Sequence, residues 1–144
     1  MSADSGVAMK RLSIFMIVVG VSLIVLLPFA FDVWPAGFRW SHPHGHPAYE
    51  RMIVAIYMSL GVCLIAAARD PLKHAILIDF TILSSVAHGG VMTYDAIAQD
   101  GELAHLVGDV PLLLVLAVVL VVCHPKRLAR GQGAGEVSGS APAD

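Results

Sequence analysis

Apolar and polar positions occur along this chain in long blocks. Four predominantly apolar runs are separated by short polar segments, and they cover residues 12–31, 49–68, 72–98 and 103–123. The first run forms an α-helix of roughly 30 Å, which matches the hydrocarbon thickness of a bilayer. Backbone polar groups in lipid must be satisfied internally, and runs of this length without period-two alternation favour helices over strands. The pattern therefore predicts an all-α integral membrane protein, a four-helix bundle.

Polar segments flank the predicted membrane domain, which covers residues 12–124. Residues 1–11 are mostly small and polar, and residues 125–144 are rich in Gly, Ser, Ala and Pro. Such segments cannot bury a core, so we predict a disordered lead and a disordered cytoplasmic tail. A basic start before an apolar run is also typical of a signal peptide. The length of the run and the lack of an A-x-A-like cleavage site disfavour that alternative.

The connections between the runs differ in length and chemistry. Pro71 cannot continue the helix that precedes it, so a short turn is expected there. A second short turn, residues 99–102, is purely acidic in its charges. The longest connection, residues 32–48, carries Trp34, Phe38 and Trp40 near its start. Aromatic residues in that place indicate a membrane interface.

The distribution of basic residues predicts the orientation. Cytoplasmic loops of membrane proteins carry an excess of Lys and Arg. Across four alternating spans, Arg39 and Arg51 lie on one side. The larger set lies on the other side, at both termini and in the middle turn: Lys10, Arg11, Arg69, Lys73, Lys126, Arg127 and Arg130. Both ends of the chain are therefore expected in the cytoplasm.

Composition agrees with a membrane location and excludes some functions. Hydrophobic residues make up 57% of the chain and charged residues 14%, whereas soluble domains carry about 25% charge. The net charge of −2 provides no basic surface for nucleic acid. The two cysteines, Cys63 and Cys123, form no CxxC pair, which argues against a disulfide framework or a thiol oxidoreductase. The lipid bilayer is therefore the first expected partner.

Ionisable residues within the predicted helices carry most of the functional information. An Asp at the centre of a membrane helix costs about 2.5–3.5 kcal/mol on insertion scales, so its presence needs a reason. Folding residues 72–98 and 103–123 into an antiparallel hairpin predicts a polar seam with Ser85 on the same face and Asp79 on nearly the opposite face. The seam would contain three facing pairs: His88 with Asp109, Asp95 with His105, and His74 with His124.

The predicted pair of His88 and Asp109 has two interpretations. A carboxylate that accepts a hydrogen bond from imidazole fixes its tautomer, and the pair could relay a proton, orient a metal ligand or bind a polar headgroup. Alternatively, the pair only specifies helix register, with serine side chains as interhelical hydrogen-bonding groups. Asp79 is expected to be held by Ser13 or by the cytoplasmic basic residues. The sequence leaves these alternatives open.

Three alternating histidines in the outer loop form a candidate metal site. His42, His44 and His46 would present imidazoles to Cu, Ni or Zn, and Glu50 is close enough to join them. The alternative is a solvated loop stiffened by prolines. Haem is disfavoured, because it would need two facing histidines within the membrane and His88 is the one deep histidine. Apart from this candidate metal, the sequence favours no cofactor.

Several local patterns resemble those of a known group of proteins. They are Ala67-Ala68-Arg69-Asp70-Pro71, Ser84-Ser85 with His88-Gly89-Gly90, and His105-Leu106-Val107-Gly108-Asp109-Val110-Pro111. Together they resemble a family of small, uncharacterised bacterial four-span membrane proteins, over residues 12–124. That family has no known activity, so the resemblance implies a location in the membrane and no reaction.

The sequence favours a bacterial inner-membrane accessory or binding protein without an enzymatic activity of its own. Its functional centre would be the polar seam. A metal-handling protein that uses the histidine loop is one alternative. A proton-coupled transporter or redox-chain subunit centred on His88, Asp109 and Asp79 is another. Four helices are few for a transport path, so a homodimer is the natural form for the transporter alternative. A homo-oligomer or a larger membrane complex is the candidate partner besides the bilayer.

Overall fold

The structure is a computed structural model that describes residues 3–40 and 47–129, and its regular elements there are helices. They are α1 (Ala3–Val33), α2 (Pro35–Phe38), α3 (Pro47–Ala67), α4 (Ala75–Ala98), η1 (Leu103–Leu106) and α5 (Asp109–Val122). Four helical segments of the described chain are long and apolar enough to cross a membrane: Gly6–Val33, Ala48–Ala67, Ala75–Ala98 and Leu103–Ala129. The predicted all-α four-helix membrane architecture is confirmed.

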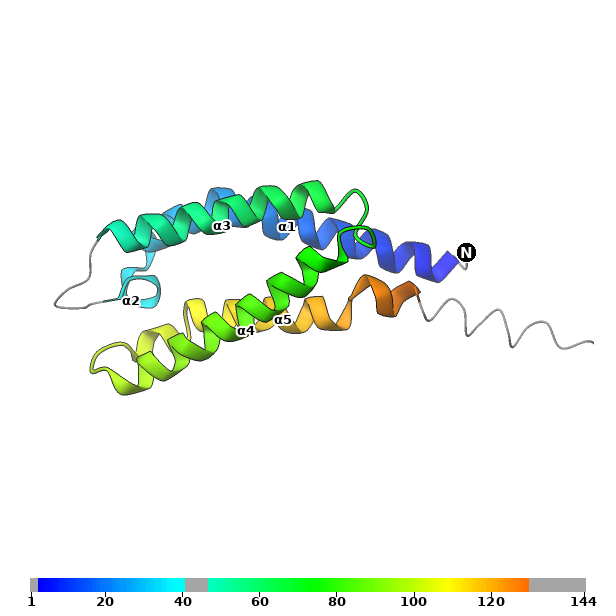
Figure 1. Cartoon of the computed structure of the whole chain (residues 1–144). Helices are drawn as coiled ribbons and strands as arrows, with labels where there is room; N and C mark the ends of the chain where they lie inside the picture. The colour runs from blue at the N-terminus through cyan, green and yellow to red at the C-terminus, as the bar shows by residue number, and fades with distance from the viewer. Residues whose placement is uncertain (1–2, 41–46, 130–144) are drawn as a thin grey trace, which may run out of the picture.

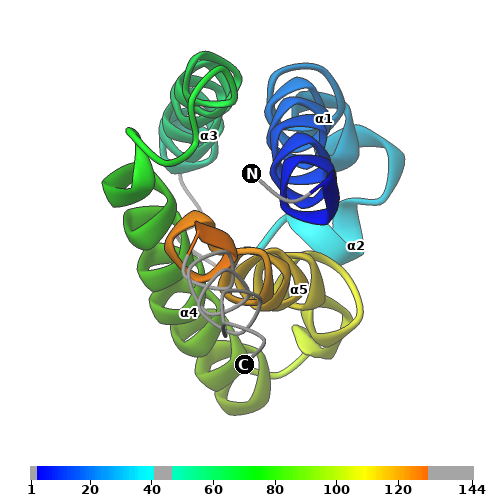
Figure 2. The same ribbon diagram turned by 90° about the vertical axis from the view of Figure 1, so that its right-hand side faces the viewer.

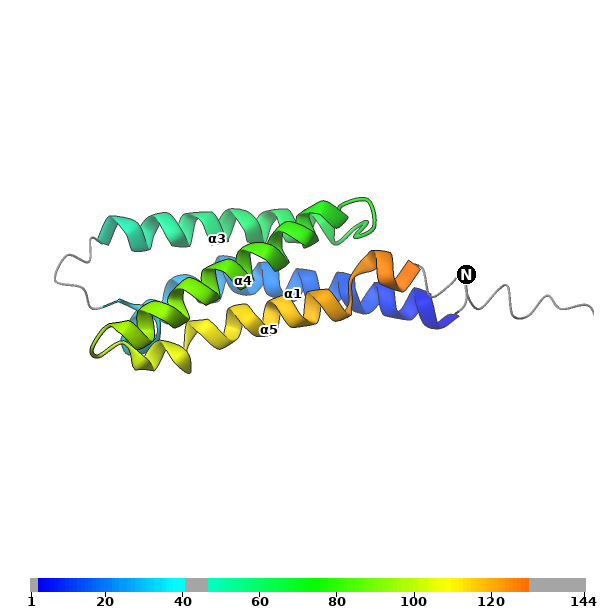
Figure 3. The same ribbon diagram turned by 60° about the horizontal axis from the view of Figure 1, so that its bottom comes forward.

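The helices form two antiparallel hairpins that lie against each other (Figures 1 and 2). α1 packs along α3, and α4 packs along α5, whereas α3 touches α4 only slightly. α2 and η1 contact each other at one end of the molecule. We call this the α2 end; α3 begins there and α4 finishes there (Figure 3). The start of α1 and the last described residues lie together at the opposite end.

The hydrophobic core joins the two hairpins at the opposite end. Its buried residues come from α1, α3 and the turn after it, α4 and α5: Leu12, Met16, Leu64, Ala67, Ala68, Ile78 and Leu120. Elsewhere many large apolar side chains face outward, among them Phe29, which is 62% exposed, and Leu83, which is 70% exposed. Such extensive exposed apolar surface suits a lipid surrounding rather than water.

The α1–α3 hairpin is held together at a backbone crossing between two glycines. A Cβ added to Gly20 would lie 2.6 Å from the carbonyl oxygen of Gly61, and a Cβ added to Gly61 would lie 2.6 Å from the carbonyl oxygen of Gly20. Close backbone approach at small residues is the usual way in which helices associate in lipid, where burial of apolar surface gives no driving force. These two glycines therefore set the distance between α1 and α3.

Two helix boundaries extend beyond the predicted domain. α1 begins at Ala3, so the expectation of a disordered lead over residues 1–11 is wrong from that residue onward. Alanine and methionine in this stretch favour helix, and residues 3–11 contain no proline that would stop it. At the other end, residues 125–129 form a further helical turn with Pro125 buried. The predicted tail therefore begins with ordered residues, and its remainder lies outside the described residues.

The two helices of the second hairpin are shorter than predicted. α4 begins at Ala75 rather than at residue 72, because the Asp70 carboxylate accepts a hydrogen bond from the backbone N–H of Lys73 at 3.1 Å and holds a turn. The fourth run is broken into η1 and α5 at residues 107–108. Pro111 explains the break, because its ring would clash with the carbonyl of residue 107 in a continuous helix, whereas proline is tolerated in a first turn.

Candidate functional site

The most enclosed polar group of the α2 end is the imidazole of His105, which is 0% exposed. Its Nδ1 lies 3.0 and 3.1 Å from the two carboxylate oxygens of Asp109. Its Nε2 lies 3.3 Å from the backbone oxygen of Arg39 and 3.3 Å from Oε2 of Glu102. The ring of Trp40 stacks on the imidazole with centroids 4.0 Å apart and planes 15° apart. We call these five residues the His105 cluster.

Local sequence brings the acidic members of the cluster to the imidazole. Glu102 precedes η1, and Asp109 is the first residue of α5, so the carboxyls lie three and four residues from His105. A carboxylate at the first turn of a helix is also stabilised by the helix dipole. Gly101 has a φ of +91°, which glycine adopts without strain and which turns the chain from α4 into η1.

The two members of the cluster that are distant in sequence, Arg39 and Trp40, directly follow α2. Proline at the first position suits a helix start, and the short helix lays its Gly37 directly on the backbone of Gly108. A Cβ added to Gly108 would lie 2.8 Å from the Cα of Gly37. This close approach places the chain after α2, with Arg39 and Trp40, against the buried imidazole.

The hydrogen-bonding groups of the cluster restrict where its protons can lie. Carboxylate and carbonyl oxygens only accept hydrogen bonds, and both ring nitrogens of His105 face such oxygens. Satisfying both sides therefore takes a proton on each ring nitrogen, or one proton retained by a carboxyl group of Asp109 or Glu102. In either state the buried polar atoms are partnered, in agreement with the lack of unsatisfied buried side-chain atoms in the described residues.

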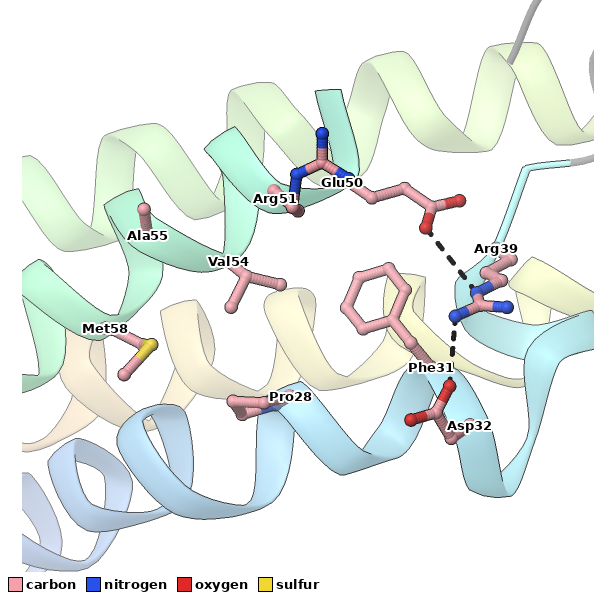
Figure 4. Close-up of a pocket in the computed structure, with 9 residues that line it drawn as sticks. All are labelled: Pro28, Phe31, Asp32, Arg39, Glu50, Arg51, Val54, Ala55 and Met58. Atoms are coloured by element: carbon pink, nitrogen blue, oxygen red, sulfur yellow. Dashed lines mark hydrogen bonds and ion pairs between the residues drawn. The ribbon is translucent and has the colours of Figure 1, made fainter. Parts of the chain in front are cut away.

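A cavity of about 330 Å³ lies beside this cluster, between α1 and α3 (Figure 4). Its apolar wall comes from both helices, and its charged side chains lie at the α2 end. The guanidinium of Arg39 reaches Asp32 at 3.0 Å and Glu50 at 3.5 Å. Its lining residues are Pro28, Phe31, Asp32, Arg39, Glu50, Arg51, Val54, Ala55 and Met58. The cavity thus combines an apolar wall with both signs of charge.

Arg39 connects the cavity to the His105 cluster. Its backbone oxygen lies against the imidazole of His105, and its side chain bridges the two carboxylates of the cavity. The side chain is 46% exposed, so it is held in place while remaining accessible. Contact of its backbone oxygen with the buried imidazole and exposure of its side chain make Arg39 the link between the His105 cluster and the open cavity.

A second polar cluster lies at the opposite end. Oδ1 of Asp79 lies 2.8 Å from Nε2 of His124, and its Oδ2 accepts a hydrogen bond from Lys126 Nζ at 3.2 Å. The backbone N–H of Lys126 lies 3.3 Å from Nδ1 of His124 and donates to it. The expected basic partner of Asp79 is therefore Lys126. These contacts tie α4 to the chain that follows α5.

The three facing pairs of the predicted seam are wrong. Asp109 pairs with His105 rather than with His88, and His124 pairs with Asp79 rather than with His74, which is exposed. His105 meets Asp109 and Glu102 instead of Asp95. The prediction assumed one continuous fourth helix. The chain breaks before α5, so η1, which carries His105, is not part of that helix.

The other predicted residues take separate places. His88 meets the ring of Tyr57 edge-on, with centroids 5.9 Å apart. Ser85 is buried on α4 at 3% exposure. Within the described ranges, the side chain of Asp95 makes no hydrogen bond or ion pair. The seam is thus replaced by a cluster at each end.

The candidate metal residues His42, His44 and His46 lie outside the described residues. In the ranges 3–40 and 47–129, no group of three or more His, Cys, Asp or Glu side chains is arranged to hold a metal ion. Glu50, which the sequence offered as a further ligand, forms an ion pair with Arg39. The metal interpretation therefore stays a prediction.

Sequence reasoning missed Arg39, Trp40 and Glu102 as site residues. Arg39 and Trp40 entered it only as a basic residue on the sparsely charged side and as an interfacial aromatic. An arginine next to a tryptophan in the longest loop was the available signal, because both residue types are enriched where buried contacts meet a polar surface. The signal did not indicate His105 as their partner.

Comparison with known proteins identifies the family but no activity. No curated protein and no solved structure matches the chain. A family model described as a family of unknown function, DUF6632, matches residues 6–139, which include all four membrane-length helices. This chain therefore belongs to the DUF6632 family.

Proposed function

We propose that this protein is a small accessory binding protein of the bacterial inner membrane, which holds an amphiphilic ligand at its α2 end. The observation that carries the proposal is the double role of Arg39. Its backbone is fixed by the fully buried His105, and its guanidinium lies in an open cavity. A scaffold that positions a charged side chain over an apolar wall is typical of a binding site.

The chemistry of the cavity favours binding over catalysis. The cavity volume of about 330 Å³ falls in the range of small-molecule sites. Its apolar residues suit a hydrocarbon portion, and its charged residues suit a polar head. Its carboxylates, Asp32 and Glu50, both lie within ion-pair distance of Arg39. Both are therefore paired with a positive charge, and neither is a free general acid or base.

Basic residues support an orientation with the α2 end outside. Arg39 and Arg51 are the two basic residues of that side, against seven at the termini and the middle turn. Positive charge marks the cytoplasmic side, so the ligand would enter from the outer leaflet or from the space beyond it. Both termini then lie in the cytoplasm.

Orientation can be tested with single cysteines. In a Cys63→Ala/Cys123→Ala background, we expect Asp100→Cys to react with a membrane-impermeant maleimide in intact spheroplasts. Lys73→Cys should react only after the membrane is opened, because its turn lies on the basic, cytoplasmic side. Both positions are exposed, so access to the reagent depends on the side of the membrane. Labelling of Lys73→Cys in intact spheroplasts would reverse the assigned orientation.

The binding function is tested by filling the cavity. Protein extracted from its own membranes in mild detergent should carry a bound amphiphile, seen by native mass spectrometry as a mass adduct. Ala55→Trp should lose the adduct because the indole occupies the cavity. Ala66→Trp, an exposed position of the same helix away from the cavity, is the matched control and should retain it. An unchanged adduct in Ala55→Trp, or none in the wild type, would refute the proposed function.

A further inference from the structure

We infer that the ligand of the cavity is a zwitterionic phospholipid with a free ammonium group, of which phosphatidylethanolamine is the type. The inference rests on the proposed function, because it names the chemical class that the same cavity would take. It is drawn from the arrangement of four charged side chains and from the apolar surface that continues from the cavity along α1 and α3.

The four charges of the cavity are unevenly paired. Arg39 meets both carboxylates, Asp32 and Glu50, so this triad carries a net negative charge. Arg51 also lines the cavity and, among the described residues, forms no ion pair or hydrogen bond through its side chain. In Figure 4 its guanidinium lies apart from the triad. One site therefore offers a positive point and a negative point that are separated in space.

A zwitterionic headgroup matches that arrangement. Arginine binds phosphate oxygens through its planar fork of N–H donors, so Arg51 suits the phosphate. The carboxylates of Asp32 and Glu50 suit an ammonium group, which donates hydrogen bonds that a quaternary choline cannot donate. Their side chains are 72% and 35% exposed, so a ligand can reach them. An anionic lipid without an amine would meet the net negative triad unfavourably.

The apolar wall extends the match to the acyl chains. Pro28, Phe31, Val54 and Met58 also line the cavity (Figure 4). One turn farther from the α2 end, Val25 and Val62 are exposed at 47% and 59%. They lie three and four residues from Pro28 and Met58, so they continue the apolar surface on nearly the same helix faces. The headgroup and glycerol would occupy the cavity, and the acyl chains would leave it across α1 and α3 into the bilayer. A free water-soluble headgroup would lack these contacts.

Competition between lipids tests the inference. Full-length protein is exchanged into detergent with equal amounts of phosphatidylethanolamine, phosphatidylcholine and phosphatidylglycerol of the same acyl chains, and native mass spectrometry reports the occupancy of each. We expect phosphatidylethanolamine to exceed each of the others by about fivefold, as two partly exposed ion pairs allow. Millimolar glycerophosphoethanolamine should not displace it. Displacement by this soluble compound would show that the headgroup alone is recognised and would overturn the assignment to a lipid.

Two variants separate the two halves of the headgroup. Asp32→Asn should lower phosphatidylethanolamine to the level of phosphatidylcholine, because it removes a carboxylate partner of the ammonium. Arg51→Gln should lower all three lipids alike, since each carries a phosphate. Lys73→Gln, which removes an exposed positive charge outside the cavity, is the control and should change none of them.

The outcomes distinguish this inference from the proposed function. Equal occupancy of the three lipids, or a preference for phosphatidylglycerol, would overturn the headgroup assignment. If Ala55→Trp still abolished lipid retention in that case, binding at the cavity would stand. Lipid retention that does not change in Ala55→Trp would refute both the headgroup assignment and the proposed binding at the cavity.

Discussion

Replacing Gly20 with leucine is expected to separate α1 from α3 and to destabilise the protein by about 3 kcal/mol, the upper part of the range for overpacking. A side chain at this position would begin 2.6 Å from the Gly61 carbonyl oxygen and 2.7 Å from Ile65. The obstacle includes backbone, so a change of rotamer cannot relieve it. Unfolding of the purified protein, followed by circular dichroism during heating in detergent, measures the loss.

Gly90→Leu is the matched control for this substitution. Gly90 lies in α4, and a Cβ added there has no heavy atom within 4 Å. A leucine at this exposed position is expected to change the stability by less than about 0.5 kcal/mol, as for most surface substitutions. Equal melting temperatures for Gly20→Leu and the wild type would show that α1 and α3 do not cross at these glycines.

Replacing His105 with alanine is expected to cost about 3–5 kcal/mol, the usual cost of removing one partner from a buried ion pair. The carboxylates of Asp109 and Glu102, whose side chains are only 15% and 3% exposed, would lose their shared partner. The stacking partner of Trp40 would also disappear. The melting temperature in detergent and the emission of Trp40, read in a Trp34→Phe background, report the two effects separately.

His124→Ala is the appropriate comparison, because it removes a histidine from the cluster at the opposite end. Its partner Asp79 is 42% exposed and keeps Lys126, so the loss should be smaller and the emission of Trp40 unchanged. An equal or greater loss in His124→Ala would contradict the ranking of the two clusters.

The long-range architecture could be predicted from the sequence because the bilayer imposes it. A run of about 20 apolar residues has few other stable conformations in lipid, and all four runs became helices. The boundaries were less predictable, because they depend on local chemistry. Asp70 holds the turn before α4 with a side-chain hydrogen bond, and Pro111 moves the start of α5 to Asp109.

The sequence could predict which candidate site residues share one helix face, but not which residues of another helix they meet. His105 and Asp109 are four residues apart on one face in the sequence, and the structure joins them to each other. Their assignment to partners on α4 failed because counting along two straight helices could not include the break at residues 107–108. Errors of one helical turn change every facing pair along such a hairpin.

Contacts across the chain could not be predicted at all. Arg39 meets His105 over a separation of 66 residues, through a short helix that the loop composition did not indicate. The approach of Gly37 to Gly108 and of Gly20 to Gly61 is equally hidden, because a glycine in a sequence does not name its partner. These contacts decide where the cavity forms and which charges line it.

The most direct test of this account is whether the His105 cluster holds Arg39 over the ligand cavity. His105→Gln retains a hydrogen-bonding side chain but cannot reach Asp109 and the Arg39 carbonyl together or stack as a ring on Trp40. Native mass spectrometry of this variant, extracted from its own membranes, measures the retained amphiphile, with His124→Gln as the matched control and helicity by circular dichroism confirming folding. We expect folded His105→Gln to lose most of the adduct and His124→Gln to keep it. A folded His105→Gln protein with the wild-type adduct would show that the His105 cluster does not hold Arg39 over the cavity.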